Sequence, residues 1–289
     1  MSKHGIIGAN VMDRLVKCPG SLKLGNGSLA SHDKQNKGYT HNCIEDNESV
    51  KFGLIVDELA KDYYRHKVGL PSKKKYFAKL EHELNPVYNE PAIKYANHLQ
   101  KIGKKLGEGI VDPVYDLSRY MKNLDNCEFR VQFNPDFVAM SYMKRGIAFV
   151  SDLSTAKTDD RNKMFQVICC AIGVIKYNPE ITDCICEVYN STSETVQVTK
   201  LSREELEAYR DDVILPALSS VSSALESEDV EEYRHKCSWC NHFCILKYDG
   251  CKACNSEDRL VDNIVDIDLE FNLNNMSEEI TRAYCNLFN

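Results

Sequence analysis

The region between residues 127 and 202 places the tightest limit on the fold of this 289-residue chain. Three short runs rich in β-branched and aromatic residues come first, separated by turn-forming residues, and they predict an antiparallel meander. An apolar helix, two more strands and a long helix follow. The predicted strands cover residues 127–133, 137–143, 146–154, 183–190 and 195–202, and the helices cover 162–177 and 202–225. This order predicts an α+β or mixed α/β core.

The ends of the predicted elements carry local signals. Ser202 would cap the last helix, with Glu205 at the capping-box position. Towards the N-terminus, apolar residues recur at three- and four-residue spacing in residues 11–17 and 50–69, which predicts helices. A further amphipathic helix is expected from residue 91 to 106, with Pro91 in its first turn. The first third of the chain is therefore expected to be mainly helical.

We divide the chain into four parts on this pattern. They are an N-terminal helical portion (1–120), the core (121–230), a cysteine cluster (231–256) and an acidic tail (257–289).

The composition excludes several classes of protein. The 36 basic and 43 acidic residues give a formal net charge of −7, so any contact with DNA must be local. No apolar run approaches the ~20 residues that a membrane helix needs. The N-terminus lacks the pattern of a secretory signal. We expect a cytoplasmic protein without membrane contact.

Thirteen cysteines are many for an intracellular chain, and metal binding accounts for them better than disulfides do. Seven lie in apolar or mixed stretches and are expected to be small buried hydrophobes: Cys43, Cys127, Cys169, Cys170, Cys184, Cys186 and Cys285. Five others fall within eighteen residues: Cys237, Cys240, Cys244, Cys251 and Cys254. Two C-x-x-C pairs in this cluster suit a tetrahedral zinc ion. Three of its cysteines together with the distant Cys18 suit an iron–sulfur centre instead, and both alternatives stay open.

Two aspartates lie at a predicted hairpin. Asp136 follows Asn134-Pro135 between two predicted strands, and Asp152 lies at the end of the third. A hairpin of this length can bring both carboxylates to one edge, and two carboxylates with a nearby histidine are the ligand set of Mg²⁺ or Mn²⁺. Such an ion activates water and neutralises charge on a phosphodiester, so phosphodiester hydrolysis is the natural reaction. The alternative is that each aspartate forms a turn.

Six short motifs occur in the order found in one known family. They are KCPGS with Cys18, GYTH with His41 and the later Glu45, Asn134-Pro135-Asp136, FVSDLSTAKT with Asp152, FQVICCA with Gln166, and CSWCNHFC with Cys237, Cys240 and Cys244. Through them the chain resembles RecB-type nucleases of the PD-(D/E)XK superfamily that carry an iron–sulfur cluster. That group includes AddB nuclease domains, CRISPR adaptation nucleases and phage RecB-like proteins. The resemblance covers roughly residues 10–250.

The resemblance implies a fold and a catalytic site. The fold would be a restriction-endonuclease-like core sheet flanked by helices and closed by the cysteine cluster. Asp136, Asp152 and His41 would bind Mg²⁺ or Mn²⁺, and Gln166 would orient the site and the DNA. The family places a lysine two residues after the second acidic residue, where this chain has Ser154. Lys157, three residues further on, is the expected source of that positive charge.

The resemblance also implies a cofactor. The ligands of a 4Fe–4S cluster would be Cys18, Cys237, Cys240 and Cys244. The last two of these are spaced more closely than in the family, so Cys251 is the substitute for Cys244.

We therefore expect a divalent-metal-dependent exonuclease that hydrolyses single-stranded or end-exposed DNA. One alternative is a catalytically weakened nuclease-fold protein that binds DNA or a recombination or replication partner. Another is a zinc-stapled interaction protein. If the chain is phage-encoded, the host cytoplasm is its expected location.

Overall fold

The structure is a computed structural model that describes residues 6–20, 48–71, 85–107, 109–119, 129–141, 146–155 and 161–227. Its helices are α1 (Ala9–Lys17), α4 (Glu48–Lys67), α6 (Pro86–Leu106), α7 (Arg161–Tyr177), α8 (Arg203–Tyr209) and α9 (Leu215–Glu226). Its strands are β1 (Ile6–Gly8), β2 (Ile110–Val111), β3 (Tyr115–Asp116), β4 (Arg130–Phe133), β5 (Phe137–Ser141), β6 (Ile147–Ser154), β7 (Asp183–Asn190) and β8 (Thr195–Ser202). The expected mixture of helices and sheet is confirmed.

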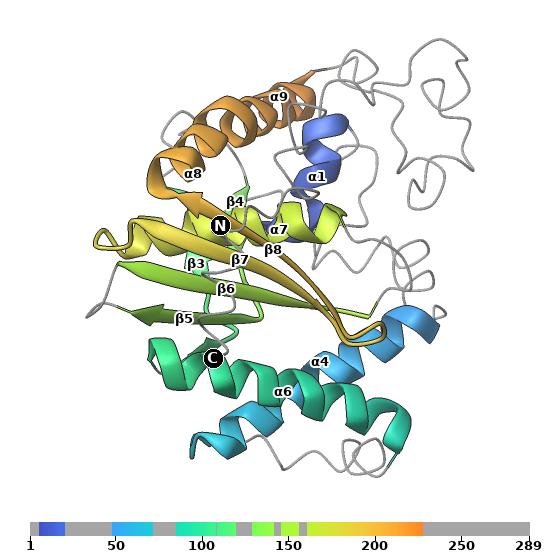
Figure 1. Cartoon of the computed structure of the whole chain (residues 1–289). Helices are drawn as coiled ribbons and strands as arrows, with labels where there is room; N and C mark the ends of the chain where they lie inside the picture. Colours follow the sequence, from blue (N-terminus) through green and yellow to red (C-terminus); the bar gives the residue numbers. More distant parts are fainter. Residues whose placement is uncertain are drawn as a thin grey trace.

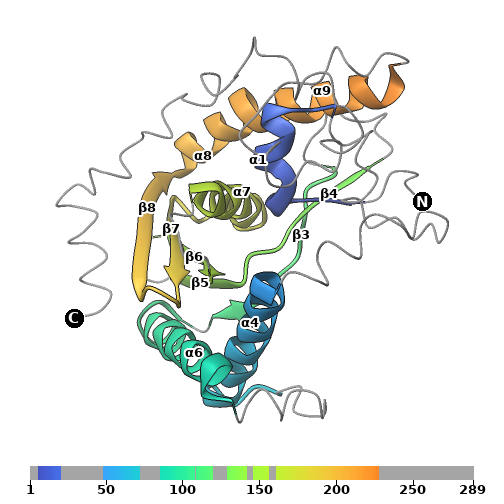
Figure 2. The ribbon, with the colours of Figure 1, turned by 90° about the vertical axis from the view of Figure 1, so that its right-hand side faces the viewer.

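The larger sheet has the strand order β2-β5-β6-β7-β8 and lies between two layers of helices (Figure 1). Its central strands β6 and β7 run parallel and are joined through α7, whereas the other neighbours run antiparallel. Figure 2 shows α4 and α6 on one face of this sheet and α7, α1, α8 and α9 on the other. The sheet therefore has two separate cores, one against each helical layer.

Alternation along β6 assigns side chains to these two cores. Ala148 and Val150 pack in the cluster that contains α7, whereas Phe149 and Leu153 pack in the cluster that contains α4 and α6. A strand that is buried on both faces reads as an almost continuous apolar run, as IAFV does here. Asp152 lies within this buried strand, two residues before its end.

One strand of the expected meander belongs elsewhere. β5 and β6 form the predicted antiparallel hairpin, but β4 pairs in parallel with β1 and antiparallel with β3 in a separate three-stranded sheet. The free edge of β5 is taken by β2. Pro135, between β4 and β5, has no N–H to donate to a continuing ladder. The predicted meander of three strands is therefore wrong at its first strand.

The helix boundaries agree with local capping chemistry. The Ser202 side chain accepts a hydrogen bond from the Glu205 N–H, and the Glu205 side chain accepts one from the Ser202 N–H, so the predicted capping box is confirmed. The expected helix 202–225 is interrupted by a π-helical turn over Arg210–Ile214, just before Pro216. A proline inside an α-helix lacks the N–H and crowds the preceding turn, and a wider turn relieves this crowding.

The expected start of the helix at residue 91 is wrong. α6 begins at Pro86, and the Asn85 side chain caps it by accepting a hydrogen bond from the Val87 N–H. Pro91 therefore lies inside the helix.

Four of the buried cysteines behave as small apolar side chains. Cys169 and Cys170 on α7 and Cys184 and Cys186 on β7 all lie in the core on the α7 side of the sheet, as expected. Cys43, Cys127 and Cys285 lie outside the described residues. None of the described helices is long and apolar enough to cross a membrane.

Candidate metal centre

Asp136 and Asp152 lie side by side at one end of the central hairpin. The Asp136 N–H donates a hydrogen bond of 2.8 Å to Asp152 Oδ1, and the Leu153 N–H donates one of 2.8 Å to Asp136 Oδ2. Because β5 and β6 run antiparallel with Phe137 opposite Ser151, the residue before β5 falls opposite Asp152. The structure therefore brings together the two carboxylates that the sequence spacing had placed at one edge.

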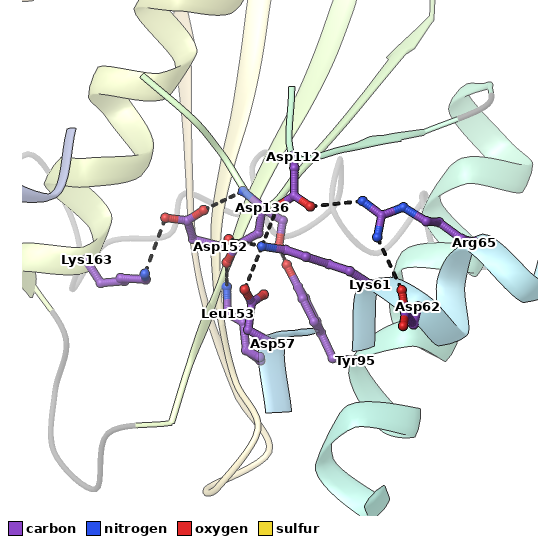
Figure 3. Close-up of polar contacts among 11 residues, drawn as sticks. Asp57, Lys61, Asp62, Arg65, Tyr95, Asp112, Asp136, Asp152, Leu153 and Lys163 are labelled. Atoms are coloured by element: carbon purple, nitrogen blue, oxygen red, sulfur yellow. Dashed lines mark hydrogen bonds and ion pairs between the residues drawn. The ribbon is translucent and has the colours of Figure 1, made fainter. Parts of the chain in front are cut away.

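Helix α4 contributes a lysine to the same place (Figure 3). The Lys61 ammonium lies 2.8 Å from Asp136 Oδ1, 2.6 Å from Asp57 Oδ2 and 2.6 Å from Asp112 Oδ1. Asp57 lies one turn earlier on α4, and Asp112 lies in the connection between β2 and β3. This group was not expected from the sequence. Its only signal is the Asp57–Lys61 spacing of four, which is ordinary on a solvated helix face.

A second lysine approaches from the other face of the sheet. Lys163, in the first turn of α7, has its ammonium 3.5 Å from Asp152 Oδ2, and its side chain is 25% exposed. On the α4 side, Arg65 pairs with Asp112 at 2.9 Å and with Asp62 at 3.4 Å. Both helical layers therefore place cations around the aspartate pair, which Figure 3 shows.

Burial and mutual repulsion set the protonation of the carboxylates. Burial raises the pKa of Asp152 to about 7, and the charge of Asp136 adds to the rise. Burial and Asp136 also raise the pKa of Asp57 to about 7. Burial acts to raise the pKa of Asp136 as well, but the charges of Lys61 and Lys163 outweigh it and hold the pKa below its usual value.

The pKa of Lys61 moves in the opposite direction from a simply buried amine. Burial acts to lower it, but the charges of Asp136 and Asp57 outweigh burial and raise the pKa above its usual value. Lys61 is therefore a permanent cation at neutral pH.

The group has an excess of carboxylates that a divalent cation would neutralise. Its carboxylates are those of Asp57, Asp62, Asp112, Asp136 and Asp152, and they outnumber the three cations Lys61, Arg65 and Lys163 by two. Asp152 is fully buried, yet among the described residues its Oδ2 accepts no hydrogen bond, and the Lys163 ammonium lies 3.5 Å from it. A carboxyl group whose pKa is raised to about 7 still binds a proton at neutral pH, and a metal ion would compete with that proton. Within the described part of the chain, no three Asp, Glu, His or Cys side chains form a complete metal site.

A metal ion here would need a third ligand beside Asp136 and Asp152. The resemblance assigns that role to His41, which lies outside the described residues. Lys157, the expected source of positive charge, also lies outside them.

The remaining expected site residues are placed as follows. Ser154 ends β6, is buried, and accepts a hydrogen bond from the Ser191 N–H through its main-chain oxygen. Gln166 lies on α7, about one turn after Lys163, and is half-buried. Cys18 is buried at the C-terminal end of α1. Cys237, Cys240, Cys244 and Cys251 lie outside the described residues.

A buried polar network on the α6 side was not anticipated. The fully buried Glu187 accepts a hydrogen bond of 2.7 Å from Ser151 Oγ, and both its carboxylate oxygens lie within 2.9 Å of His98 Nε2. Ser151 also contacts the Tyr95 hydroxyl at 3.0 Å. This network ties α6 to β6 and β7 immediately beside Asp152, so it fixes the strand that carries the aspartate.

Compared with known proteins, the chain matches no family model and no curated protein.

The raised pKa of Asp152 predicts a pH-dependent gain from Asp152→Asn. The usual pKa of 3.8 applies to the unfolded chain and about 7 to the folded one, so the stability that the protonated group contributes is complete below pH 3.8 and is lost as pH rises through 7. Asparagine keeps the acceptor for the Asp136 N–H and never ionises. The advantage of the variant over wild type in free energy of unfolding should therefore grow by roughly 1–3 kcal/mol as the pH is raised from 5 to 7.

The measurement is chemical denaturation at both pH values in the presence of EDTA. Asp183→Asn, at the start of β7, is the control, because the Lys200 and Thr182 side chains overcome burial there and lower the pKa of Asp183. A gain for Asp152→Asn that is the same at both pH values would contradict the raised pKa.

Proposed function

We propose that this protein is a divalent-metal-dependent nuclease of RecB type, built on a restriction-endonuclease-like core. The order of elements supports the proposal: a hairpin of β5 and β6, then α7, then β7 parallel to β6. The six motifs supply the resemblance. The proposed substrate is single-stranded or end-exposed DNA, which a chain of net charge −7 would contact only locally.

The observation that carries the proposal is the aspartate pair, with Asp152 buried, Asp136 half-buried and cations on both sides. Asp136 and Asp152 share main-chain hydrogen bonds, and Lys61 and Lys163 approach them from opposite faces of the sheet. A structural turn needs neither a second carboxylate beside the first nor two lysines. A phosphodiester, which carries negative charge and gains more in the transition state, needs this combination of acidic ligands and nearby cations.

Each residue of the site has a separate task in this proposal. Asp136 and Asp152, with His41 as the third ligand, would hold Mg²⁺ or Mn²⁺. The ion supplies charge neutralisation at the phosphate and activation of a water molecule. Lys163 would place its ammonium beside the scissile phosphate, which the Ser154 hydroxyl cannot do. Gln166, on the same helix, would contact the DNA.

A catalytically weakened protein that binds DNA, or a recombination or replication partner, is the second candidate. Ser154 favours it, because the position is buried and leaves no cation on the strand itself. Cleavage assays distinguish the two candidates.

The first prediction of the proposal concerns Lys163. Purified protein with Mn²⁺ should cleave labelled single-stranded DNA, and Lys163→Met should lower the rate about 10²–10³-fold, since preorganised positive charge at a phosphate contributes about that much. Lys176→Met, at the exposed far end of α7, is the matched control and should cleave like wild type.

Three outcomes decide between the candidates. Cleavage that depends on Lys163 supports the nuclease. Cleavage that survives Lys163→Met but is lost in Lys157→Ala assigns the positive charge to the residue expected from the sequence. DNA binding without cleavage by wild type and by Ser154→Lys, in Mn²⁺ and Mg²⁺, supports the binding protein instead.

We also propose that Cys18, Cys237, Cys240 and Cys244 ligate a 4Fe–4S cluster, with Cys251 as the substitute for Cys244. Of these proposed ligands, Cys18 lies within the described residues. It is buried at the end of α1, and α1 packs against α7. A cluster at Cys18 would therefore attach the C-terminal cysteines directly to the core. The other ligands are proposed from their spacing in the sequence.

The cluster proposal predicts a coloured protein that absorbs broadly near ~400 nm, as thiolate-ligated iron–sulfur centres do. Cys18→Ser and Cys237→Ser should each lose the bound iron and lower the thermal midpoint, because each removes one ligand that joins distant parts of the chain. Cys127→Ser should keep the iron. Colourless protein that contains zinc would support the zinc-stapled alternative, and unchanged iron in Cys18→Ser would remove Cys18 from the ligand set.

A further inference from the structure

Lys61 is held more tightly than a lysine that is free to reach a substrate. Its side chain is only 9% exposed, and its single ammonium makes three ion pairs of 2.6 to 2.8 Å with Asp57, Asp112 and Asp136. An ammonium has three N–H donors, so three carboxylate acceptors use all of them. The Lys163 side chain is more exposed, at 25%, and its ammonium lies 3.5 Å from Asp152 Oδ2.

The three acceptors converge from separate segments. Asp57 comes from α4, Asp112 from the connection between β2 and β3, and Asp136 from the residue before β5. Asp112 has a positive φ of 53°, an uncommon backbone conformation that aspartate tolerates better than most residues. Its N–H donates to the Asp136 main-chain oxygen at 3.1 Å, which joins two of the three segments.

A second contact fixes the third segment. The Gly109 N–H donates to the Tyr64 hydroxyl at 3.0 Å, so the residue before β2 is attached to α4 one turn beyond Lys61. A side chain at Gly109 would collide with the Phe137 ring, which lies 2.0 Å from where its Cβ would be. The arrangement around the ammonium is therefore built into the packing of α4 on the sheet.

The ammonium occupies the point on which three carboxylate oxygens converge. Hard divalent cations bind carboxylate oxygens at about 2.0–2.6 Å, and a small inward movement of the three acceptors would reach that range. Asp136 contributes one oxygen, Oδ1, to this point and directs the other to the Leu153 N–H beside Asp152. The Asp136 carboxylate thus lies between the Lys61 ammonium and Asp152, in the position that a bridging carboxylate has in two-metal sites.

We propose that Lys61 is a fixed cation that takes the place of a second metal ion, so that the site binds one divalent ion, on the Asp152 side. This inference rests on the proposed function for the one ion in the wild-type protein. Lys61 acts as a positioning residue: it pairs with Asp57 and Asp112 and holds Asp136 with its remaining oxygen directed to the hairpin. The prediction is that removal of the ammonium opens a second binding point.

The experiment counts Mn²⁺ ions bound to the full-length protein by calorimetric titration and by electron paramagnetic resonance of free Mn²⁺. Wild type should bind one equivalent and Lys61→Met two. Arg65→Met is the matched control, since it removes a positive charge that contacts Asp112 from the next turn of the same helix. It should still bind one equivalent, because Lys61 remains among the three carboxylates.

The double variant Lys61→Met/Asp112→Asn tests the ligands of the second ion. It lacks both the ammonium and one of the three carboxylates, and it should return to one equivalent. If Lys61→Met folds only when Mn²⁺ is present and then holds one more equivalent than wild type, the ion has replaced the ammonium and the proposal stands. If it fails to fold even with Mn²⁺, the ammonium is not replaceable by a metal and the proposal is wrong.

The other outcomes separate this inference from the proposed function. One equivalent in wild type and one in folded Lys61→Met would overturn the inference and leave the nuclease proposal intact. No binding to wild type but one equivalent to Lys61→Met would support the inference and remove the metal site at Asp152. Two equivalents in wild type would overturn the inference directly.

Discussion

The ion pair between Lys61 and Asp136, at 2.8 Å, is the contact on which the site depends. Buried carboxylates are costly unless they are paired, and removal of one partner of a buried pair typically costs about 3–5 kcal/mol. Lys61 lowers the pKa of Asp136 against the effect of burial and so keeps a charged carboxylate inside the protein. Asp136 in turn raises the pKa of Asp152 and orients it through a main-chain hydrogen bond.

The two helical layers act on the pair in different ways. α4 supplies a cation that is fixed by three carboxylates, whereas α7 supplies the more exposed Lys163. On the α6 side, Glu187 of β7 pairs with His98 and accepts a hydrogen bond from Ser151 of β6, which fixes β6. The aspartate pair is therefore held rigidly on the α4 and α6 side, whereas the α7 side, with Lys163, is more accessible.

The features that could be predicted from the sequence are those that depend on residues close together along the chain. The bounds of β7 and β8 and the Ser202 capping box follow from alternation and from end signals within a few residues, and the structure confirms them. The partner of β4 did not follow, because β2 competes for the edge of β5 and β2 has only two residues. Lys61 and Lys163 were also missed. A lysine on a helix normally points to water, and the contact between Lys61 and Asp136 spans 75 residues of sequence.

Anomalous X-ray diffraction from crystals of the protein soaked in Mn²⁺ would show whether Asp136 and Asp152 hold a divalent cation. One manganese peak is expected in contact with carboxylate oxygens of both aspartates, with the Lys61 ammonium still among its three partners. Crystals that diffract well but show no manganese at the pair, or manganese at Asp57 and Asp112 with Lys61 displaced, would contradict this expectation.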